Sequence, residues 1–163
     1  MTGADASAAR PAWPQALADL RAPLDERFRA IPFAALLGIE LDDWGPGWSR
    51  VRLTPSPALH NLAGTVHGGA VATLADIAFE VACNGHGRVS VALDLTAHFT
   101  APAVDDLLVA EADEVTRSRR TASYRITVTQ GATTIAWFLA VAYRTARWHL
   151  GEDRYPPSWR ETH

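Results

Sequence analysis

The feature that most constrains the fold is the run at residues 68–84, which is apolar on nearly every side of a helix. One apolar stripe at helical spacing is formed by Val71, Leu74, Ala75, Ala78 and Ala82. The remaining faces are apolar as well, through Ala70, Ala72, Ile77, Phe79 and Val81. A helix that is hydrophobic all round is buried, so the rest of the chain has to cover it. Gly85 and Gly87 end this helix.

Runs typical of β-strands flank this helix on both sides. Two short runs precede it, at 39–43 and 48–54, with a turn between them. Others follow it, at 89–99, 107–116, 122–129 and 133–143. The last of these is apolar on both alternating faces, which predicts an interior strand. The order predicts an α+β fold in which an antiparallel sheet wraps around one long central helix, the hotdog architecture.

An extra N-terminal helix is predicted at residues 13–30. Apolar residues recur there at helical spacing among charged ones, at Leu17, Leu20, Leu24 and Phe28. We expect an interruption or offset near Pro23 and a position over an edge of the core. The helix belongs to a single domain at 13–144. Residues 1–12 are expected to be a disordered lead, and 145–163 a C-terminal extension, an irregular tail that packs on the domain.

Composition limits the partners and the compartment. The net charge of -3 offers no general attraction to a polyanion, so nucleic acid is not expected as a partner. The single cysteine, Cys83, forms no internal disulfide, which fits a reducing compartment. No run is long and apolar enough for a membrane span, and no secretory signal is visible, so we expect a cytoplasmic protein without membrane contact.

Two glycines, Gly68 and Gly69, follow His67 at the start of the central helix. Glycines let the backbone pass close to a bound group, and the first N–H groups of a helix have no partner within it. Together these features suit an oxyanion site for a developing negative charge. The alternative is that the glycines only allow close packing of the helix on the sheet.

Asp76 and Glu80 are the carboxylates of the central helix, one turn apart and therefore on one face. Residues 61–87 contain no Lys or Arg to pair with them. An acid in so apolar a helix is costly unless it is used or hydrogen-bonded, which makes both residues candidates for catalysis or an acid/base pair. The alternative is an exposed stripe on a partly covered helix.

Other kinds of site find less support in the sequence. His67 has no second ligand at metal spacing, so we predict no metal and no cofactor. There is no Gly-x-Ser-x-Gly motif, and Cys83 lies in the apolar helix, where a thiol is usually inert. A basic cluster is formed by Arg117, Arg119, Arg120 and Arg125. These side chains are either solvated or hold phosphates through paired hydrogen bonds.

The segment 60–84, HNLAGTVHGGAVATLADIAFEVACN, resembles the core motif of the PaaI-type (phenylacetic acid degradation) hotdog acyl-CoA thioesterases. The matching positions are Asn61, His67-Gly68-Gly69, Leu74-Ala75-Asp76 and Ala82-Cys83-Asn84. Residues 99–102 resemble the family's F-x-x-P feature at a strand end. The resemblance covers about 33–144 and leaves both terminal extensions unexplained.

The resemblance implies a homo-oligomer, a dimer or tetramer, with each active site built across the dimer interface. The substrate would be an acyl-CoA, with an aromatic acyl group expected, hydrolysed to free acid and CoA; coenzyme A is thus part of the substrate. Asp76 would be the nucleophile or the general base for water. The N–H of Gly68, with Gly69, would polarise the thioester carbonyl. Asn61 would orient water or the thioester, and His67 would support the site.

Two departures from the family pattern affect the strand after the helix and the helix itself. Related enzymes often carry a Ser or Thr on that strand where this chain has Ala92, and Ser90 or Thr96 are the possible substitutes. Strand alternation would place all three on one face. Glu80 replaces a small apolar residue and is expected to shape the acyl pocket or to act as an accessory carboxylate.

Two further expectations and two alternative functions complete the sequence-based hypothesis. Arg117, Arg119 and Arg120 are expected to contact the CoA phosphates. An apolar strand edge with Val91, Leu93 and Leu95 is expected to be covered by a second subunit. A hydratase or dehydratase that pairs His67 with Asp76, and a non-enzymatic acyl-CoA-binding module, remain as alternatives.

Overall fold

The computed structural model describes residue 10 and residues 13–163 of the chain. The expectation of a disordered lead at 1–12 therefore falls, apart from Arg10, outside the described residues. Helical segments are α1 (Ala18–Arg29), α2 (Pro32–Leu37), α3 (Gly68–Asn84) and α4 (Pro157–Thr162), with short 3-10 turns at Gln15–Leu17, Pro57–Leu59 and Glu152–Arg154. The strands are β1 (Ile39–Gly45), β2 (Trp48–Leu53), β3 (Arg88–Phe99), β4 (Leu108–Arg117), β5 (Thr121–Gln130) and β6 (Thr133–Trp148).

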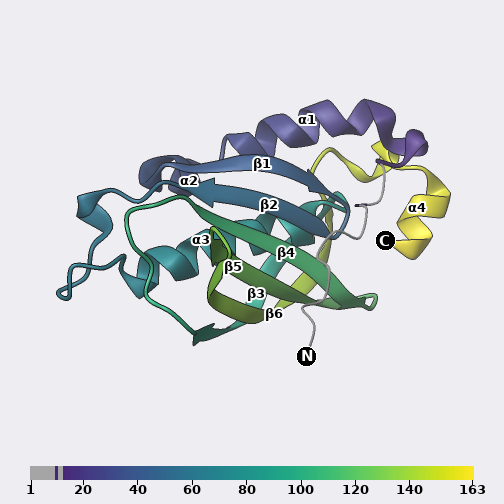
Figure 1. The fold of residues 1–163 in the computed structure, drawn as a ribbon. Coiled ribbons are helices and arrows are strands. Elements are labelled where there is room, and N and C mark those ends of the chain that lie inside the picture. Colours follow the sequence, from purple (N-terminus) through teal and green to yellow (C-terminus); the bar gives the residue numbers. More distant parts are fainter. Residues whose placement is uncertain (1–9, 11–12) are drawn as a thin grey trace.

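The strands form one antiparallel sheet in the order β1-β2-β4-β5-β6-β3. This sheet curves around α3, as Figure 1 shows. The predicted hotdog architecture is confirmed, and β6 lies inside the sheet as its two apolar faces predicted. The position of β3 at the edge of the sheet matters for the site, because its outer edge has no neighbouring strand among the described residues.

The main core lies between α3 and the concave face of the sheet. Leu74, Ala75 and Ala78 of α3 are fully buried there against inward side chains of the strands, such as Ile126 and Phe138. Each buried aliphatic or aromatic side chain contributes about 1.5–3 kcal/mol relative to exposure. The apolar sequence of the helix is thus explained by burial on almost every side.

A second, smaller core fixes α1 over the edge of the sheet beside β1 (Figure 1). The ring of Phe28 meets Trp44 edge-to-face at 4.7 Å, and the Trp44 indole N–H donates to Asp25 at 2.8 Å. The helix runs through Pro23 without a break, in contrast to the predicted interruption. The short helix α2 was not predicted, because six residues are too few to show a helical period.

The C-terminal residues are more regular than the irregular tail expected at 145–163. Strand β6 continues to Trp148, and α4 follows after the buried Tyr155. The Tyr155 ring packs on Gly87, which has a φ of 91° and no room for a side chain. This contact places α4 beside the start of β3. No helix of the described residues has the length and the hydrophobicity that crossing a membrane takes.

Candidate active site

The amino end of α3 carries one free backbone donor. The imidazole Nδ1 of His67 accepts a hydrogen bond from the Gly69 N–H at 2.8 Å and so caps the helix. The Gly69 N–H is therefore already hydrogen-bonded within the chain, which argues against the expectation that it polarises the thioester carbonyl. Among the described residues, the Gly68 N–H has no acceptor. The helix dipole adds partial positive charge at the same place.

Gly68 and Gly69 open into different cavities on the two sides of the helix end. Gly68 lines a cavity of about 400 Å³ together with Asn61 and Phe99. A side chain at Gly68 would lie 3.5 Å from the Phe99 ring, an ordinary contact distance. Gly69 lines a cavity of about 370 Å³ with His67 and apolar residues of α2. Both glycines thus line cavities, and a side chain at Gly69 would lie only 3.0 Å from His67 Nδ1, so the glycine there keeps the helix cap free of crowding.

Asp76 and Glu80 lie together further along α3, in a third cavity of about 230 Å³. Asp76 is half-buried and Glu80 is exposed, and neither carboxylate forms an ion pair or a side-chain hydrogen bond with another described residue. Burial raises the pKa of Asp76 above its ordinary value. Although Glu80 is exposed on one side, partial burial of its carboxylate in the cavity and then the charge of Asp76 raise the pKa of Glu80. A carboxylate left unpaired in this way is a candidate base or nucleophile.

Cys83 lines the same cavity but is not suited to nucleophilic chemistry. Its thiol is buried, and burial together with the charges of Glu80 and Asp76 raises its pKa. A thiol that stays protonated at neutral pH is a poor nucleophile. Among the described residues, no three His, Cys, Asp or Glu side chains group closely enough to hold a metal.

A β-bulge decides which residue of β3 faces the carboxylates. Ala92 pairs with Ala142, but Asp94 pairs with Val141, so one extra residue is inserted between them. The bulge reverses the alternation, and Thr96 therefore does not share a face with Ser90 and Ala92 as predicted. Ser90 and Ala92 line the cavity of Asp76. The side chain of Ser90 is the hydroxyl next to the carboxylates.

Asn61 lies near Gly68, but most of its hydrogen bonds serve its own loop. Its Oδ1 accepts from the Ala63 N–H at 2.8 Å, and its Nδ2 donates to the Thr65 hydroxyl at 2.8 Å. One amide hydrogen remains for a ligand in the cavity that Asn61 shares with Gly68. The structure thus brings Asn61 to the helix end and places Asp76 and Glu80 elsewhere.

The predicted basic cluster is only partly brought together. Arg117 and Arg119 line a cavity of about 680 Å³ at the far end of the sheet, whereas Arg120 is not among its lining residues. Arg88, Arg144 and Arg160 join them, and sequence reasoning missed these three because they come from β3, β6 and α4. Spacing along the chain carries no signal for such a cluster.

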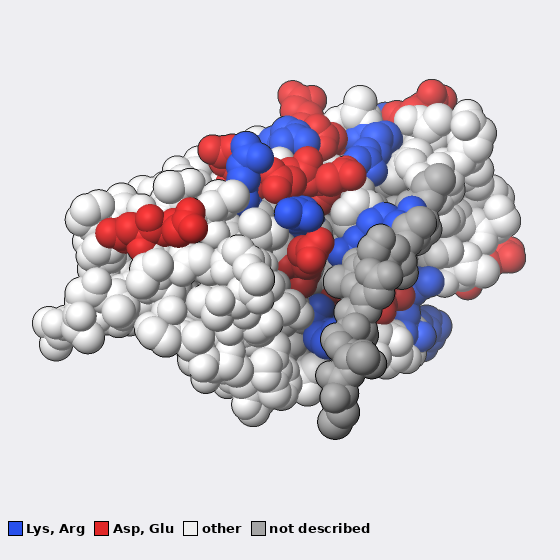
Figure 2. Space-filling model, in the orientation of Figure 1, with Lys and Arg blue, Asp and Glu red and all other residues white. Residues whose placement is uncertain are grey.

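The charged side chains on the face shown in Figure 2 are mixed in sign over β1, β2 and β4. Arg52, for example, pairs with Glu40 at 2.6 Å and with Asp42 at 2.7 Å. Paired surface charges of this kind present no positive field to an anionic ligand. The arginine cavity differs in this respect from the charged surface over β1, β2 and β4.

The outer edge of β3 is apolar and open. Val91 is 49% exposed, Leu93 61% and Phe99 53%. Leu95, predicted to lie with them, packs partly against the core because the bulge turns it inward. An unpaired apolar edge strand is a surface that proteins usually cover.

Comparisons with known proteins point in one direction. Residues 63–136 match the thioesterase superfamily. The acyl-coenzyme A thioesterase PaaI of Escherichia coli is 33% identical over 121 residues, which cover 73% of this chain and 86% of that protein.

Two solved structures are similar as well. That of the Escherichia coli PaaI protein from the phenylacetic acid degradation operon superposes with a TM-score of 0.73 at 28% identity, covering 76% of this chain and 91% of that one. A mutant of the phenylacetic acid degradation protein PaaI from Thermus thermophilus superposes with a TM-score of 0.68 at 35% identity, covering 70% and 99%.

Proposed function

The chain belongs to the PaaI-type hotdog branch of the thioesterase superfamily and is a thioester hydrolase, and from this premise we propose that it hydrolyses acyl-CoA at a site shared by two subunits. Gly68 of one subunit polarises the thioester carbonyl, and Asp76 of the other attacks the carbonyl carbon or deprotonates water beside it. Free acid and CoA are the products. Coenzyme A enters only as part of the substrate.

The observation that carries this proposal is the placement of Gly68 and Asp76 in separate cavities of one subunit. Asp76 follows Gly68 by eight residues, which in a helix is a rise of about 12 Å and a rotation of two full turns plus about 80°. Direct attack on a carbonyl held by the Gly68 N–H allows a span of no more than about 7 Å between the N–H and the carboxylate. The two groups of one helix do not reach the same thioester, so the second group comes from another copy.

The open edge of β3 supports such a pairing. An antiparallel β3 of a second copy would satisfy the unpaired backbone groups and cover Val91 and Leu93. It would also bring the second α3 alongside the first. A two-fold axis there creates two equivalent sites, each with one Gly68 and one Asp76.

Electrostatics favour this division of roles. The unpaired N–H and the helix dipole at Gly68 stabilise the negative charge that develops on the thioester oxygen. The raised pKa of Asp76 makes its carboxylate a stronger base than an ordinary aspartate. Ser90 lines the same cavity and would hold a water for that carboxylate, and Glu80 and Phe79 would form walls for an aromatic acyl group.

Within one subunit, the His67 and Asp76 pair that the alternative of a hydratase requires finds no support in the geometry. His67 Nδ1 is occupied by the Gly69 N–H, and the ring lines the cavity beside α2 and away from Asp76. An acid/base pair needs both groups on one substrate.

Release of free thiol from an aromatic acyl-CoA tests the proposal. Asp76→Asn keeps the size of the side chain and removes its charge, and we expect a loss of about 10²–10⁴-fold in kcat. Glu80→Gln is the matched control on the same helix face, with a smaller expected loss. Wild-type turnover by Asp76→Asn would show that the reaction does not depend on this carboxylate.

A further inference from the structure

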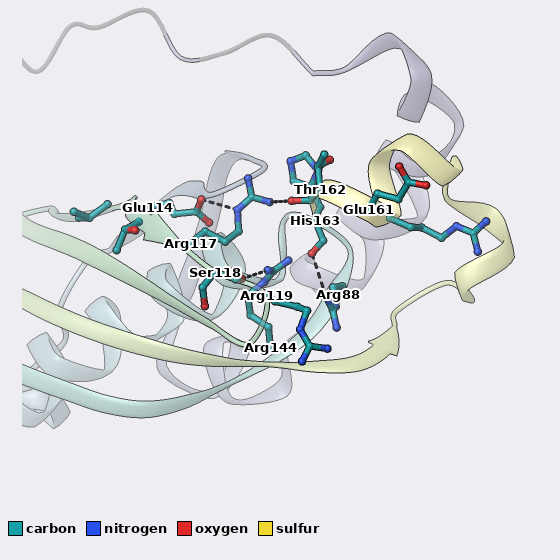
Figure 3. Close-up of a pocket in the computed structure, with 12 residues that line it drawn as sticks. Arg88, Glu114, Arg117, Ser118, Arg119, Arg144, Glu161, Thr162 and His163 are labelled. Atoms are coloured by element: carbon teal, nitrogen blue, oxygen red, sulfur yellow. Dashed lines mark hydrogen bonds and ion pairs between the residues drawn. The ribbon is translucent and has the colours of Figure 1, made fainter.

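The arginine cavity, defined by Arg88, Arg117, Arg119, Arg144 and Arg160, lies between the end of β4, the start of β3, β6 and α4. Figure 3 shows Arg88, Arg117, Arg119 and Arg144 gathered beside Thr162 and His163. The volume is about 680 Å³, within the range of small-molecule sites. Part of the wall comes from the C-terminal residues that the family resemblance does not cover.

Arg144 is buried there without full compensation. Only 4% of the residue is exposed. Its Nη1 donates to the Ser118 carbonyl, while its buried Nη2 has no hydrogen-bond partner among the described residues. The buried Nε of Arg160 is also without a partner in the described part of the chain, although Nη1 of the same side chain pairs with Glu152 at 3.2 Å. A buried guanidinium that lacks partners is costly, so the site is incomplete as it stands.

The acids near the cavity do not fill this need. Glu114 accepts from Arg117 at 2.9 Å and from the Tyr124 hydroxyl at 2.8 Å, and it pairs with His86 at 2.8 Å. Arg88, Arg119 and Arg144 form no ion pair with any described residue. Glu161 also lines the cavity and Glu152 pairs with Arg160, but the five arginines still outnumber these three acids, so the positive charge at the cavity exceeds the negative charge.

The protonation equilibrium of Arg144 reflects the same excess. Burial, and then the charges of Arg117 and Arg88, lower the pKa of Arg144 to about 10. The group stays charged at neutral pH. An anion bound beside it would reverse the effect of the neighbouring charges.

From this geometry we propose that the arginine cavity binds a phosphate-bearing anion. Guanidinium groups from several directions match the oxygens of a phosphate better than the single plane of a carboxylate. The phosphates belong either to the CoA part of the substrate or to a separate phosphate compound. The first source rests on the proposed function, and the second does not.

Binding to the full-length chain, without turnover, tests the proposal. Inorganic phosphate, ADP and free CoA serve as probes, and binding is measured by calorimetry and by the rise in melting temperature. Arg119→Gln removes an exposed arginine without a partner, and Arg144→Met replaces the buried one. We expect each to weaken binding of ADP or CoA about ten-fold. Arg125→Gln, outside the cavity, is the control and should bind like wild type.

Arg144→Met also separates binding from folding. Replacing a buried charge by an apolar side chain of similar length is often neutral or stabilising. We expect a melting temperature near that of wild type, together with a smaller rise caused by ADP or CoA. Should Arg144→Met fail to fold, Arg119→Gln decides the outcome. Absence of binding by every probe at millimolar concentration, or equal binding by all variants, would overturn the proposal.

Kinetics with two substrates identify the source of the phosphate. An acyl-pantetheine carries the thioester without the nucleotide phosphates. A larger rise in KM for acyl-CoA than for acyl-pantetheine in Arg119→Gln assigns the cavity to CoA. An equal effect on both, with weakened binding of ADP, assigns it to a separate compound. A chain without thioesterase activity would contradict the proposed function and leave the binding result standing.

Discussion

Replacing Gly68 by proline removes the proposed oxyanion donor and little else. Gly68 is the first residue of α3, a position where proline is favoured because the lost N–H has no partner in the helix. His67 before it is extended, with ψ at 133°, as a residue before proline prefers. The nearest side chain, Phe99, would lie 3.5 Å from a Cβ at this position, so the Cβ of a proline makes an ordinary contact there. We therefore expect Gly68→Pro to fold with a nearly unchanged melting temperature.

The expected kinetic effect is large. Loss of one oxyanion donor typically lowers kcat by about 10²–10³-fold, or about 2.7–4 kcal/mol of transition-state stabilisation. The control is Gly68→Ala, which keeps the N–H and adds a methyl group at the same contact distance from Phe99. The assay is thiol release from an acyl-CoA at saturation. If Gly68→Pro turns over like Gly68→Ala, the N–H has no part in the reaction.

Mixing Gly68→Pro with Asp76→Asn tests whether the site is shared. Random pairing of equal amounts makes half of the dimers mixed, and one of the two sites in each mixed dimer combines an intact Gly68 with an intact Asp76. Activity should therefore recover to about a quarter of the wild-type value in a two-fold symmetric dimer. No recovery is possible if both groups act within one subunit.

Three predictions concern stability. The raised pKa values of Asp76 and Glu80 mean that their ionised forms oppose folding, so stability is lost as the pH rises through these folded-state pKa values. Neutralising Asp76 should raise the melting temperature at pH 7 by a few degrees in calorimetry, and neutralising Glu80, which solvent screens more, should raise it by less. Burial alone would raise the pKa of Glu114, but hydrogen bonds lower this pKa to about 2. The stabilisation of the fold by the Glu114 carboxylate is therefore present above the ordinary pKa of 4.5 and is lost as the pH falls towards 2. Denaturant titration should show Glu114→Gln about 3 kcal/mol less stable than wild type at pH 7, and much closer to it at pH 2. The added methyl group of Gly87→Ala would overlap the Tyr155 ring, whereas Gly131→Ala shares the positive φ but has open space around it. Gly87→Ala should therefore lower the free energy of unfolding by about 2 kcal/mol more than Gly131→Ala. Equal losses would mean that Tyr155 moves aside freely.

The sequence was sufficient for the parts of the fold that depend on local pattern. The bounds of α3 follow from its apolar run and the glycines that flank it, and the structure places the helix at Gly68–Asn84 as predicted. The interior position of β6 follows from its two apolar faces. Both features are properties of side chains near in sequence, which is why periodicity reveals them.

The features that were missed depend on contacts distant in sequence. The bulge between Ala92 and Asp94 inserts a residue without any turn signal, and it moved Thr96 away from the face where alternation had put it. Use of the Gly69 N–H by His67 depends on a ring orientation that spacing does not fix. The arginine cavity joins Arg88 to Arg144 across two strands that are far apart in the chain.

The two carboxylates of α3 show why fold stability alone does not account for this chain. Asp76 and Glu80 occupy the half-covered stripe of an otherwise apolar helix, and each opposes folding when ionised. An alanine at either position would suit the helix and its burial better. A second copy at the edge of β3 would bury them further and raise this cost, unless a partner group or a substrate meets them in the interface. In the proposed dimer the amino end of the opposing α3 supplies that partner, since its dipole and the free Gly68 N–H favour a negative charge. The same pairing that completes the catalytic site therefore also offsets part of the unfavourable charge of Asp76.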